Sequence, residues 1–313
     1  MMSTLTTTLT TLRTASSGMP LTLRDSLSRE SSTSLKETKL STSTWDIYCQ
    51  EGTRSQGTRG TLKKKLVWSK DLEDFEAVPL REGVVGVAIK SEFFAQGAER
   101  VAHRCHEVEV THADGAEDAF SVNGYSLVSK ESIFEEELLN SKFHKRVARM
   151  HAQGQELADR FNERVAKLCP DDPSLYVSFV PCWIYEVTDV RYKTNVAWIL
   201  AEPKLEGKYI KWNNNGGKII DSTKCYVPEG LVSQIPQAFS HFTWSVTDRK
   251  KLFCDLQGVW NDEDGFTFTD PACHKTTSGG KRTDKGEQGM KAFFESHTCS
   301  ELCKKLALHP PMN

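Results

Sequence analysis

The sequence has 313 residues, with 40 basic and 42 acidic side chains and a formal net charge of −2. This length allows one large domain or two lobes with an ample core. The balanced charge argues against nucleic acid or a membrane surface as a partner, and no apolar run is long enough to cross a bilayer. Nine cysteines, an odd number, and the lack of an apolar signal segment favour the reducing cytoplasm over secretion. Nothing indicates an oligomeric state.

The N-terminal segment is dominated by hydroxyl side chains. Residues 1–44 contain 22 Ser or Thr and show no apolar periodicity. Such a segment buries too little surface to offset its ordering entropy. We therefore expect a disordered tail over residues 1–65, which ends with the basic run Lys63–Lys65, and an ordered domain over 70–308. The tail is a solvated segment or, alternatively, a target of phosphorylation.

Short β-rich runs and then one long helix follow the tail. The runs Val84–Ile89, Val108–Val110 and Tyr125–Val128 are separated by turns that contain Gly and Asp. Apolar residues then recur at spacings of three, four or seven from about Ile133, which predicts a helix that Pro170 terminates.

The second half of the chain returns to strands. The apolar runs Val177–Tyr185 and Val196–Leu200 predict two buried strands, and Lys251–Leu256 predicts a third. A terminal helix follows. Strands, one long helix and further strands are typical of an α+β fold.

The last thirty or so residues combine a Gly-spaced turn with metal-ligand residue types. Gly286 and Gly289 precede His297, Cys299 and Cys303. If this stretch is helical, the two cysteines lie four apart on one face. Three such ligands suit zinc, which takes four in a tetrahedron. The fourth ligand must come from elsewhere in the chain.

Several motifs in one order resemble the alpha-kinase family, the atypical protein kinases similar to myosin heavy chain kinase and elongation factor 2 kinase. The resemblance covers roughly Val78 to Leu308 and implies a two-lobed alpha-kinase fold, with an N-lobe over about 70–202 and a C-lobe over about 203–308. The matching stretches are Phe94–Arg100, Phe143–Asn162, Glu202–Asn215, Ala238–Thr243, Asp255–Val259, Thr269–Pro271 and the terminal cluster.

The resemblance supplies a fourth zinc ligand. It implies that a histidine in the Phe-Ser-His segment, here His241, joins His297, Cys299 and Cys303 in a structural zinc site of the C-lobe. Without the resemblance, the better interpretation of His241 would be a buried core histidine with its hydrogen bonds satisfied. Four protein ligands would close the site, so the zinc would stabilise the lobe and take no part in catalysis.

Asp255, Gln257 and Asp270 are the candidate catalytic residues. Asp255 and Gln257 are two apart and would share one face of a strand, where their oxygens suit Mg²⁺. The resemblance implies that Asp255 orients or deprotonates the substrate hydroxyl, while Gln257 and Asp270 hold Mg²⁺ against the phosphates of ATP. Pro271 biases Asp270 toward an extended conformation.

Two lysines compete for the role of gripping the phosphates. Val87–Lys90 spells the lysine motif of conventional protein kinases. The chain has no His-Arg-Asp or Asp-Phe-Gly motif, however, and the order of the alpha-kinase motifs implies Lys130 instead. The resemblance also gives Arg100 a supporting role at the phosphates; otherwise Arg100 is a solvated side chain.

The remaining positions implied by the resemblance are the hinge and the substrate side. Glu202 ends an apolar strand where the adenine would bind, and Gly286 and Gly289 resemble a glycine-rich loop on the peptide-substrate side. The acidic stretch Trp260–Phe268 is longer than the usual link of the family and would reshape the metal loop or favour a basic peptide.

These features predict a Ser/Thr protein kinase that uses Mg-ATP, with a protein substrate and autophosphorylation. The alternative is a pseudokinase, a catalytically weak zinc-stabilised module that binds nucleotide or protein. A zinc-stabilised interaction domain without a nucleotide site is a third reading.

Overall fold

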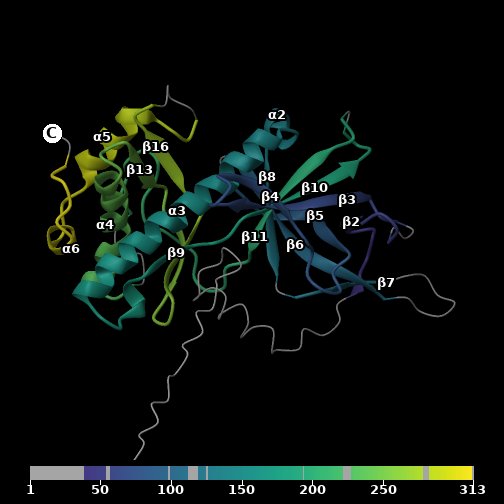
Figure 1. Ribbon diagram of the computed structural model, residues 1–313, viewed down its shortest axis with the longest axis horizontal. Coiled ribbons are helices and arrows are strands. Elements are labelled where there is room, and N and C mark those ends of the chain that lie inside the picture. Colours follow the sequence, from purple (N-terminus) through teal and green to yellow (C-terminus); the bar gives the residue numbers. More distant parts are fainter. Residues whose placement is uncertain are drawn as a thin grey trace, which may run out of the picture.

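The computed structural model describes residues 39–311 apart from 54–56, 98, 112–118, 125, 193, 221–226 and 278–281. The chain forms two lobes of mixed α and β structure, which confirms the α+β expectation (Figure 1). Strands dominate the first lobe, and helices pack around short sheets in the second.

The first lobe is a sheet that closes on itself. Its order is β1-β7-β6-β5-β2-β3-β10-β11-β8, β4 pairs with β3, and a further pairing between β6 and β8 completes the ring. β6 pairs with β8 through its first half and with β7 through its second half, while β5 pairs with it along its other edge with register shifts after Ile89 and Phe93. The strands are β1 (Lys39–Leu40), β2 (Trp45–Cys49), β3 (Gly60–Ser69), β4 (Asp74–Val78), β5 (Gly86–Gln96), β6 (Arg100–Thr111), β7 (Ala119–Val122), β8 (Leu127–Ser132), β10 (Trp183–Asp189) and β11 (Ala197–Pro203).

Alternation of side chains places two cores on the two faces of this sheet. In β10, Tyr185 and Val187 are fully buried in the cluster that fills one face. Ile184, which directly precedes Tyr185 and therefore points to the opposite face, is buried in a separate cluster with Phe143 and Val147 of the long helix. The period of two therefore separates the core inside the ring from the contact with the helix.

The long helix α3 (Ser141–Leu168) belongs to both lobes. Phe143, Val147 and Ala148 pack on the first sheet, whereas Leu157 and Phe161 enter the core of the second lobe. The helix runs diagonally between the lobes in Figure 1. It begins later than expected, because Phe134 opens a separate short helix, α2 (Glu135–Leu138), and the Asn140 side chain caps α3 by accepting the N–H of Lys142.

The second lobe is built around an aromatic core. Phe161, Phe179, Phe239, Phe253 and Phe268 are all fully buried there. One sheet has the order β12-β14-β15-β9, and β13 pairs with β16. The elements are η1 (Pro173–Leu175), β9 (Val177–Phe179), β12 (Ile210–Lys211), α4 (Leu231–Val246), β13 (Lys251–Cys254), β14 (Gln257–Asn261), β15 (Gly265–Thr269), β16 (Ala272–Lys275), α5 (Gly286–Ser296) and α6 (Glu301–Lys305).

Two expected boundaries need correction. Strands β1 and β2 and the start of β3 lie within the segment 1–65 that was expected to be disordered, so the folded part begins by Lys39; residues 1–38 lie outside the described residues. The run Val177–Tyr185 is two strands in two lobes, since β9 pairs with β15 while β10 pairs with β3 and β11. The lobes are therefore not divided simply at residues 202 and 203.

The stretch Trp260–Phe268 is an ordinary hairpin. It joins β14 to β15, and the Asn261 side chain accepts the N–H groups of Glu263 and Asp264 in the turn.

Among the helices of the described residues, none is long and apolar enough to cross a membrane.

Candidate functional site

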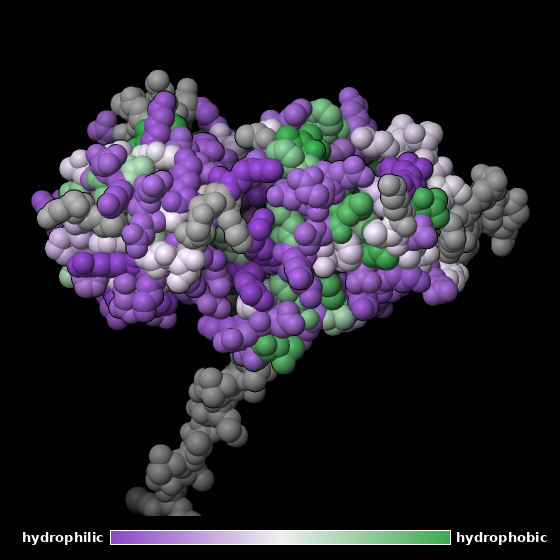
Figure 2. Space-filling model, turned by 90° about the horizontal axis from the view of Figure 1, so that it is seen from above, coloured by the Kyte–Doolittle hydropathy of each residue, from purple (hydrophilic) through white to green (hydrophobic). Residues whose placement is uncertain are grey.

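A cleft of about 1150 Å³ separates the lobes. Figure 2 shows hydrophilic side chains gathered in the hollow between them. Arg100 reaches the cleft from the first lobe, and Asp255, Gln257 and Asp270 reach it from the second. The structure thus brings all three predicted catalytic residues to one cavity.

Asp255 and Gln257 meet at a bend between strands, which corrects the expected continuous strand Lys251–Leu256. β13 ends at Cys254, Asp255 adopts a left-handed φ of 60°, and β14 begins at Gln257. The two side chains nevertheless converge, because Gln257 Nε2 donates to Asp255 Oδ2 at 3.2 Å. Lys211 Nζ lies 2.8 Å from Asp255 Oδ1.

Asn213 holds this bend in place. Its Oδ1 accepts the N–H of Leu256 at 2.9 Å, and its Nδ2 donates to Gln237 and Ser240 in the middle of α4. Asn213 is fully buried. The position of Asp255 therefore depends on a network that is anchored in the core of the second lobe.

Asp270 lies between two cations. Its Oδ1 is 2.9 Å from Arg100 Nη1, and its Oδ2 is 2.6 Å from Lys130 Nζ. Burial alone would raise the pKa of Asp270, but Arg100 and Lys130 hold it well below its usual value. Asp270 has a φ of 50°, so it is left-handed and not extended as Pro271 had suggested. Gln257 Nε2 lies 3.5 Å from the Asp270 carbonyl oxygen.

Lys130 joins Asp270 to Glu202. Its Nζ is 2.6 Å from Glu202 Oε1 and donates to Thr269 Oγ1 at 2.9 Å, while Thr269 donates to Glu202 at 2.7 Å. Burial alone would lower the pKa of Lys130, but Asp270 and then Glu202 hold it above its usual value. The Glu202 carboxylate is buried against these partners, although the sequence placed this residue at an adenine site.

The competing lysine lies elsewhere. Lys90 belongs to β5, and its Nζ lies 5.7 Å from the centre of the Trp45 ring on β2. We call Lys130, Asp255, Gln257 and Asp270 the cleft cluster, and Lys90 is not part of it.

Gly286 and Gly289 do not form a loop; they open helix α5. Gly286 has a φ of 61°, and the Asp284 side chain accepts its N–H. A Cβ at Gly289 would lie 2.5 Å from the His274 ring. The structure explains each glycine without a substrate. Gly286 is needed for its left-handed backbone, and Gly289 for its close packing against His274.

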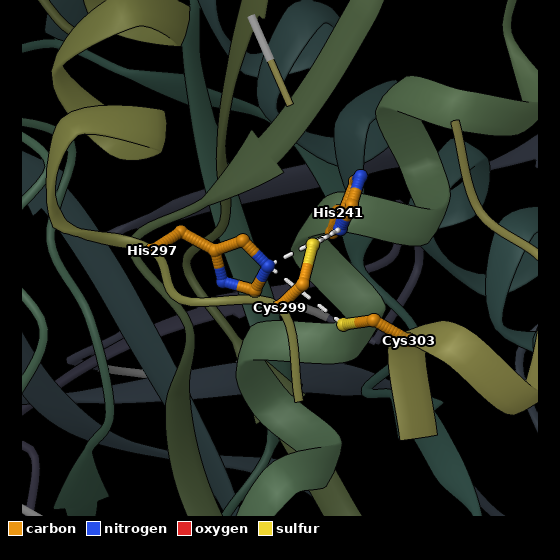
Figure 3. A group of neighbouring side chains, drawn as sticks. All are labelled: His241, His297, Cys299 and Cys303. Atoms are coloured by element: carbon orange, nitrogen blue, oxygen red, sulfur yellow. Dashed lines mark hydrogen bonds between the residues drawn. The ribbon is translucent and has the colours of Figure 1, made fainter. Parts of the chain in front are cut away.

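His241, His297, Cys299 and Cys303 lie together in the second lobe (Figure 3). We call them the His–Cys cluster. Their ligand atoms all lie within 4.8 Å of one another. His297 Nε2 is 3.2 Å from His241 Nδ1, Cys299 Sγ is 3.7 Å from His241 Nδ1, and Cys303 Sγ is 3.7 Å from His297 Nε2.

The backbone route to the His–Cys cluster differs from the single helix considered for the sequence. Helix α5 ends at Ser296, so His297 and Cys299 lie in an extended link and Cys303 in α6. Ser300 caps α6 by accepting the N–H of Cys303. This break turns the chain back toward α4, which carries His241.

The protonation of His241 and His297 favours the binding of a metal ion. His241 Nε2 lies 2.8 Å from the carbonyl oxygen of His309, so it carries the proton and leaves the Nδ1 lone pair toward the cluster. Burial lowers the pKa of His241, and burial followed by the charge of His241 lowers that of His297 to about 4. Neutral imidazoles with converging lone pairs are metal-ligand types.

The sequence did not assign roles to Lys211, Thr269 or Asn213. All three lie within or beside stretches that carried the resemblance, but their partners depend on folding across the two lobes. The signal for Thr269 was its place before Asp270 at the end of a β-rich run. Helix α4 was also missed, although Ile235, Phe239 and Phe242 recur at helical spacing.

Comparison with known proteins adds to this geometry. The alpha-kinase family matches residues 95–303. The chain is similar to myosin heavy chain kinase C of Dictyostelium discoideum, with 29% identity over 79% of this chain and 27% of the relative. It is also similar to human eukaryotic elongation factor 2 kinase, with 37% identity over 35% of this chain and 13% of the relative. The chain therefore spans only a minor part of these curated relatives.

Solved structures show the same fold. The inactive alpha-kinase domain of myosin heavy chain kinase A in complex with ATP matches with a TM-score of 0.61 and 19% identity, over 81% of this chain and 98% of that chain. The domain in complex with ADP gives a TM-score of 0.57 and 21% identity, over 82% and 100% of the two chains. This chain belongs to the alpha-kinase family.

Proposed function

We propose that the protein is a Ser/Thr protein kinase that transfers the γ-phosphate of Mg-ATP to a polypeptide hydroxyl. The observation that carries the proposal is the convergence of Asp255, Gln257 and a lysine-held Asp270 at one cleft between lobes. Membership of a family whose named relatives are protein kinases supports it, and so does the fold shared with ATP and ADP complexes.

In the proposed reaction, the substrate hydroxyl oxygen bonds to the γ-phosphorus and the bond to the bridging oxygen of ADP breaks. The hydroxyl proton passes to the Asp255 carboxylate, which lies at the bend facing the cleft. Arg100 and Lys130, now paired with Asp270, are the cations that would bind the phosphates. Glu202 keeps Lys130 positioned from behind, and the backbone of its strand is proposed to meet the adenine.

The donor set of the cleft cluster fits Mg²⁺. Gln257 and Asp270 offer amide and carboxylate oxygens, the hard ligands that this ion takes in phosphoryl-transfer sites, with Asp255 beside them. Magnesium, when bound, would neutralise charge that develops on the phosphate oxygens. We propose Gln257 and Asp270 as the residues that hold it.

The His–Cys cluster fits a structural Zn²⁺. A tetrahedral zinc with bonds of roughly 2.0 to 2.3 Å places neighbouring ligand atoms roughly 3.3 to 3.8 Å apart. The measured separations of 3.2, 3.7 and 3.7 Å agree with this spacing. The hydrogen bond from His241 to the His309 carbonyl is the kind of second contact that orients a metal-bound histidine.

A pseudokinase is less well supported, because the residues required for transfer are all present and lie together.

The cytoplasm is the proposed location of the protein. The eight cysteines of the described residues are all unpaired, which fits a reducing compartment. Proposed acceptors for autophosphorylation are the Ser and Thr residues of the N-terminal segment, outside the described residues.

The test is transfer of label from [γ-³²P]ATP to the protein itself and to Ser- or Thr-containing peptides. The matched variant is Asp255→Asn, since Asn tolerates the left-handed backbone at this bend whereas Ala does not. We expect phosphoserine or phosphothreonine with the wild type, and about a thousandfold less label with the variant at an unchanged melting temperature. A wild type that transfers no label excludes the proposed activity; an active Asp255→Asn excludes the role of Asp255.

A further inference from the structure

One face of α3 presents four cations to the cleft. Lys142, Lys145, Arg146 and Arg149 all line the cavity that holds Asp255. Their spacing of three, four and seven residues places them on one side of the helix. We call this set the basic face. It extends from Lys142 to Arg149, which is seven residue steps or about 10 Å of helix axis.

The four cations of the basic face have no ion-pair partner among the described residues, although Glu99, Glu137 and Asp284 also line the cavity. The first acidic residue of α3 is Glu156. The reaction-centre carboxylates are already paired, Asp270 with Arg100 and Lys130, and Asp255 with Lys211. An ordinary solvated helix surface usually mixes charges of both signs.

Aromatic rings position part of the basic face. The Arg149 guanidinium lies 4.3 Å from the centre of the Trp68 ring, and Lys145 Nζ lies 5.4 Å from that of Phe75. Both rings belong to the β3–β4 hairpin and contact each other edge to face. Cations held over rings lose less side-chain freedom when an anion arrives.

We propose that the basic face binds an acidic segment of the polypeptide substrate, a run of Asp and Glu residues beside the phosphoacceptor. The inference rests on the kinase activity proposed above and names the substrate class of the same cleft. The nucleotide phosphates have their own cations, Lys130 and Arg100, so the face is not needed for them. Its length of about 10 Å matches about three extended residues. An acidic segment thus replaces the basic peptide suggested by Trp260–Phe268, whose hairpin is not part of the cleft lining.

The first arm of the test measures binding without catalysis. A fluorescent peptide with four consecutive Asp or Glu residues beside an Ala in the acceptor position is titrated against the full chain. The variant Lys142→Ala/Arg146→Ala removes two exposed cations that do not touch the β3–β4 rings, and Arg160→Ala/Lys167→Ala removes two exposed cations of the same helix outside the cleft. We expect about tenfold weaker binding for the first variant and wild-type binding for the second.

Equal affinities for the wild type and both variants would overturn the inference. Binding of a phosphoserine peptide but not of the Asp/Glu peptide would also overturn it, in favour of a phosphate site. Reversal of charge in Lys142→Glu/Arg146→Glu should let a Lys-rich peptide bind instead, and a failure of this exchange counts against the face. Affinity for the acidic peptide should fall as salt rises, since exposed charges are screened.

The second arm uses the same peptides with Ser or Thr as acceptor. We expect kcat/KM about tenfold higher for the acidic peptide than for its Ala-flanked form, and this ratio should approach one in Lys142→Ala/Arg146→Ala. A ratio of one in an active wild type overturns the substrate class but leaves the kinase proposal intact. Absence of any transfer overturns the kinase proposal, and the binding arm still decides the acidic ligand.

Discussion

The cleft cluster lies between the two lobes and the His–Cys cluster lies within the second, and the two hold their polar side chains in opposite ways. In the first, Asp270 and Asp255 are paired with cations that an incoming phosphate can compete for. In the second, four neutral or weakly acidic ligand atoms converge on one another with no counter-charge among them. Exchangeable ion pairs suit a reaction centre, whereas converging lone pairs suit a permanently bound ion.

The largest effect that distinguishes the clusters should follow loss of a ligand in the His–Cys cluster. We expect Cys303→Ser to lose bound zinc and at least about 5 kcal/mol of unfolding free energy, since metal binding is folding free energy at such sites. Zinc content and thermal unfolding are the measurements. Cys273→Ser, at a buried cysteine of the same lobe away from the cluster, controls for the change of side chain and should retain zinc. A wild-type protein that contains no zinc and whose stability does not change with chelators would contradict a structural zinc at the His–Cys cluster.

The cleft cluster should respond in activity and not in fold. We expect Lys130→Met to lower kcat/KM for ATP by about a hundredfold, because Asp270 and Glu202 would lose their shared cation. Lys90→Met is the matched control and should change it less than about twofold. Steady-state kinetics with circular dichroism checks both. The opposite ranking of the two lysines would show that the conventional kinase motif is the functional one.

Gly289 tests whether the two clusters are mechanically linked. A Cβ there would press on His274, which accepts the N–H of Lys285 and lies 3.0 Å from the Asn215 carbonyl oxygen near the cleft. We expect Gly289→Ala to cost about 1 to 3 kcal/mol of stability. The exposed Gln288→Ala in the same helix should stay within about 0.5 kcal/mol. Loss of peptide phosphorylation without loss of zinc would show that the added methyl group disturbs the cleft cluster through His274 and leaves the His–Cys cluster intact.

The smallest effect concerns a site remote from both clusters. Burial lowers the pKa of His106 from 6.5 to about 4, so the unfolded chain binds the extra proton first as pH falls. The stability due to neutral His106 is complete above pH 6.5 and is lost between 6.5 and about 4, at most about 2 kcal/mol at pH 5. His106→Phe should flatten this part of a melting-temperature profile against pH. If the profile of His106→Phe matches that of the wild type, His106 is not the source of the stability lost between pH 6.5 and about 4.

Much of the fold class and the site could be predicted, and the failures have physical causes. The order of motifs identified the family, which the comparisons confirm. The same order named Lys130 and Asp270 as candidate site residues, and the structure places them 2.6 Å apart. The bend at Asp255 was missed, because the apolar run from Lys251 to Leu256 carries no mark of a left-handed φ. The run Val177–Tyr185 looked like one strand although Pro181 interrupts it, and only pairing across the lobes separates its halves.

Helix α3 has a consequence for how the protein can be divided. Its first turns complete the hydrophobic core of one lobe and its last turns complete the core of the other. A fragment that ends anywhere within this helix would expose one of those apolar surfaces to water. Each lobe thus depends on a segment that the other also needs, and we expect calorimetry to record one shared melting transition in place of two. We therefore expect the pair of lobes together, and neither lobe alone, to be the smallest part of the chain that folds.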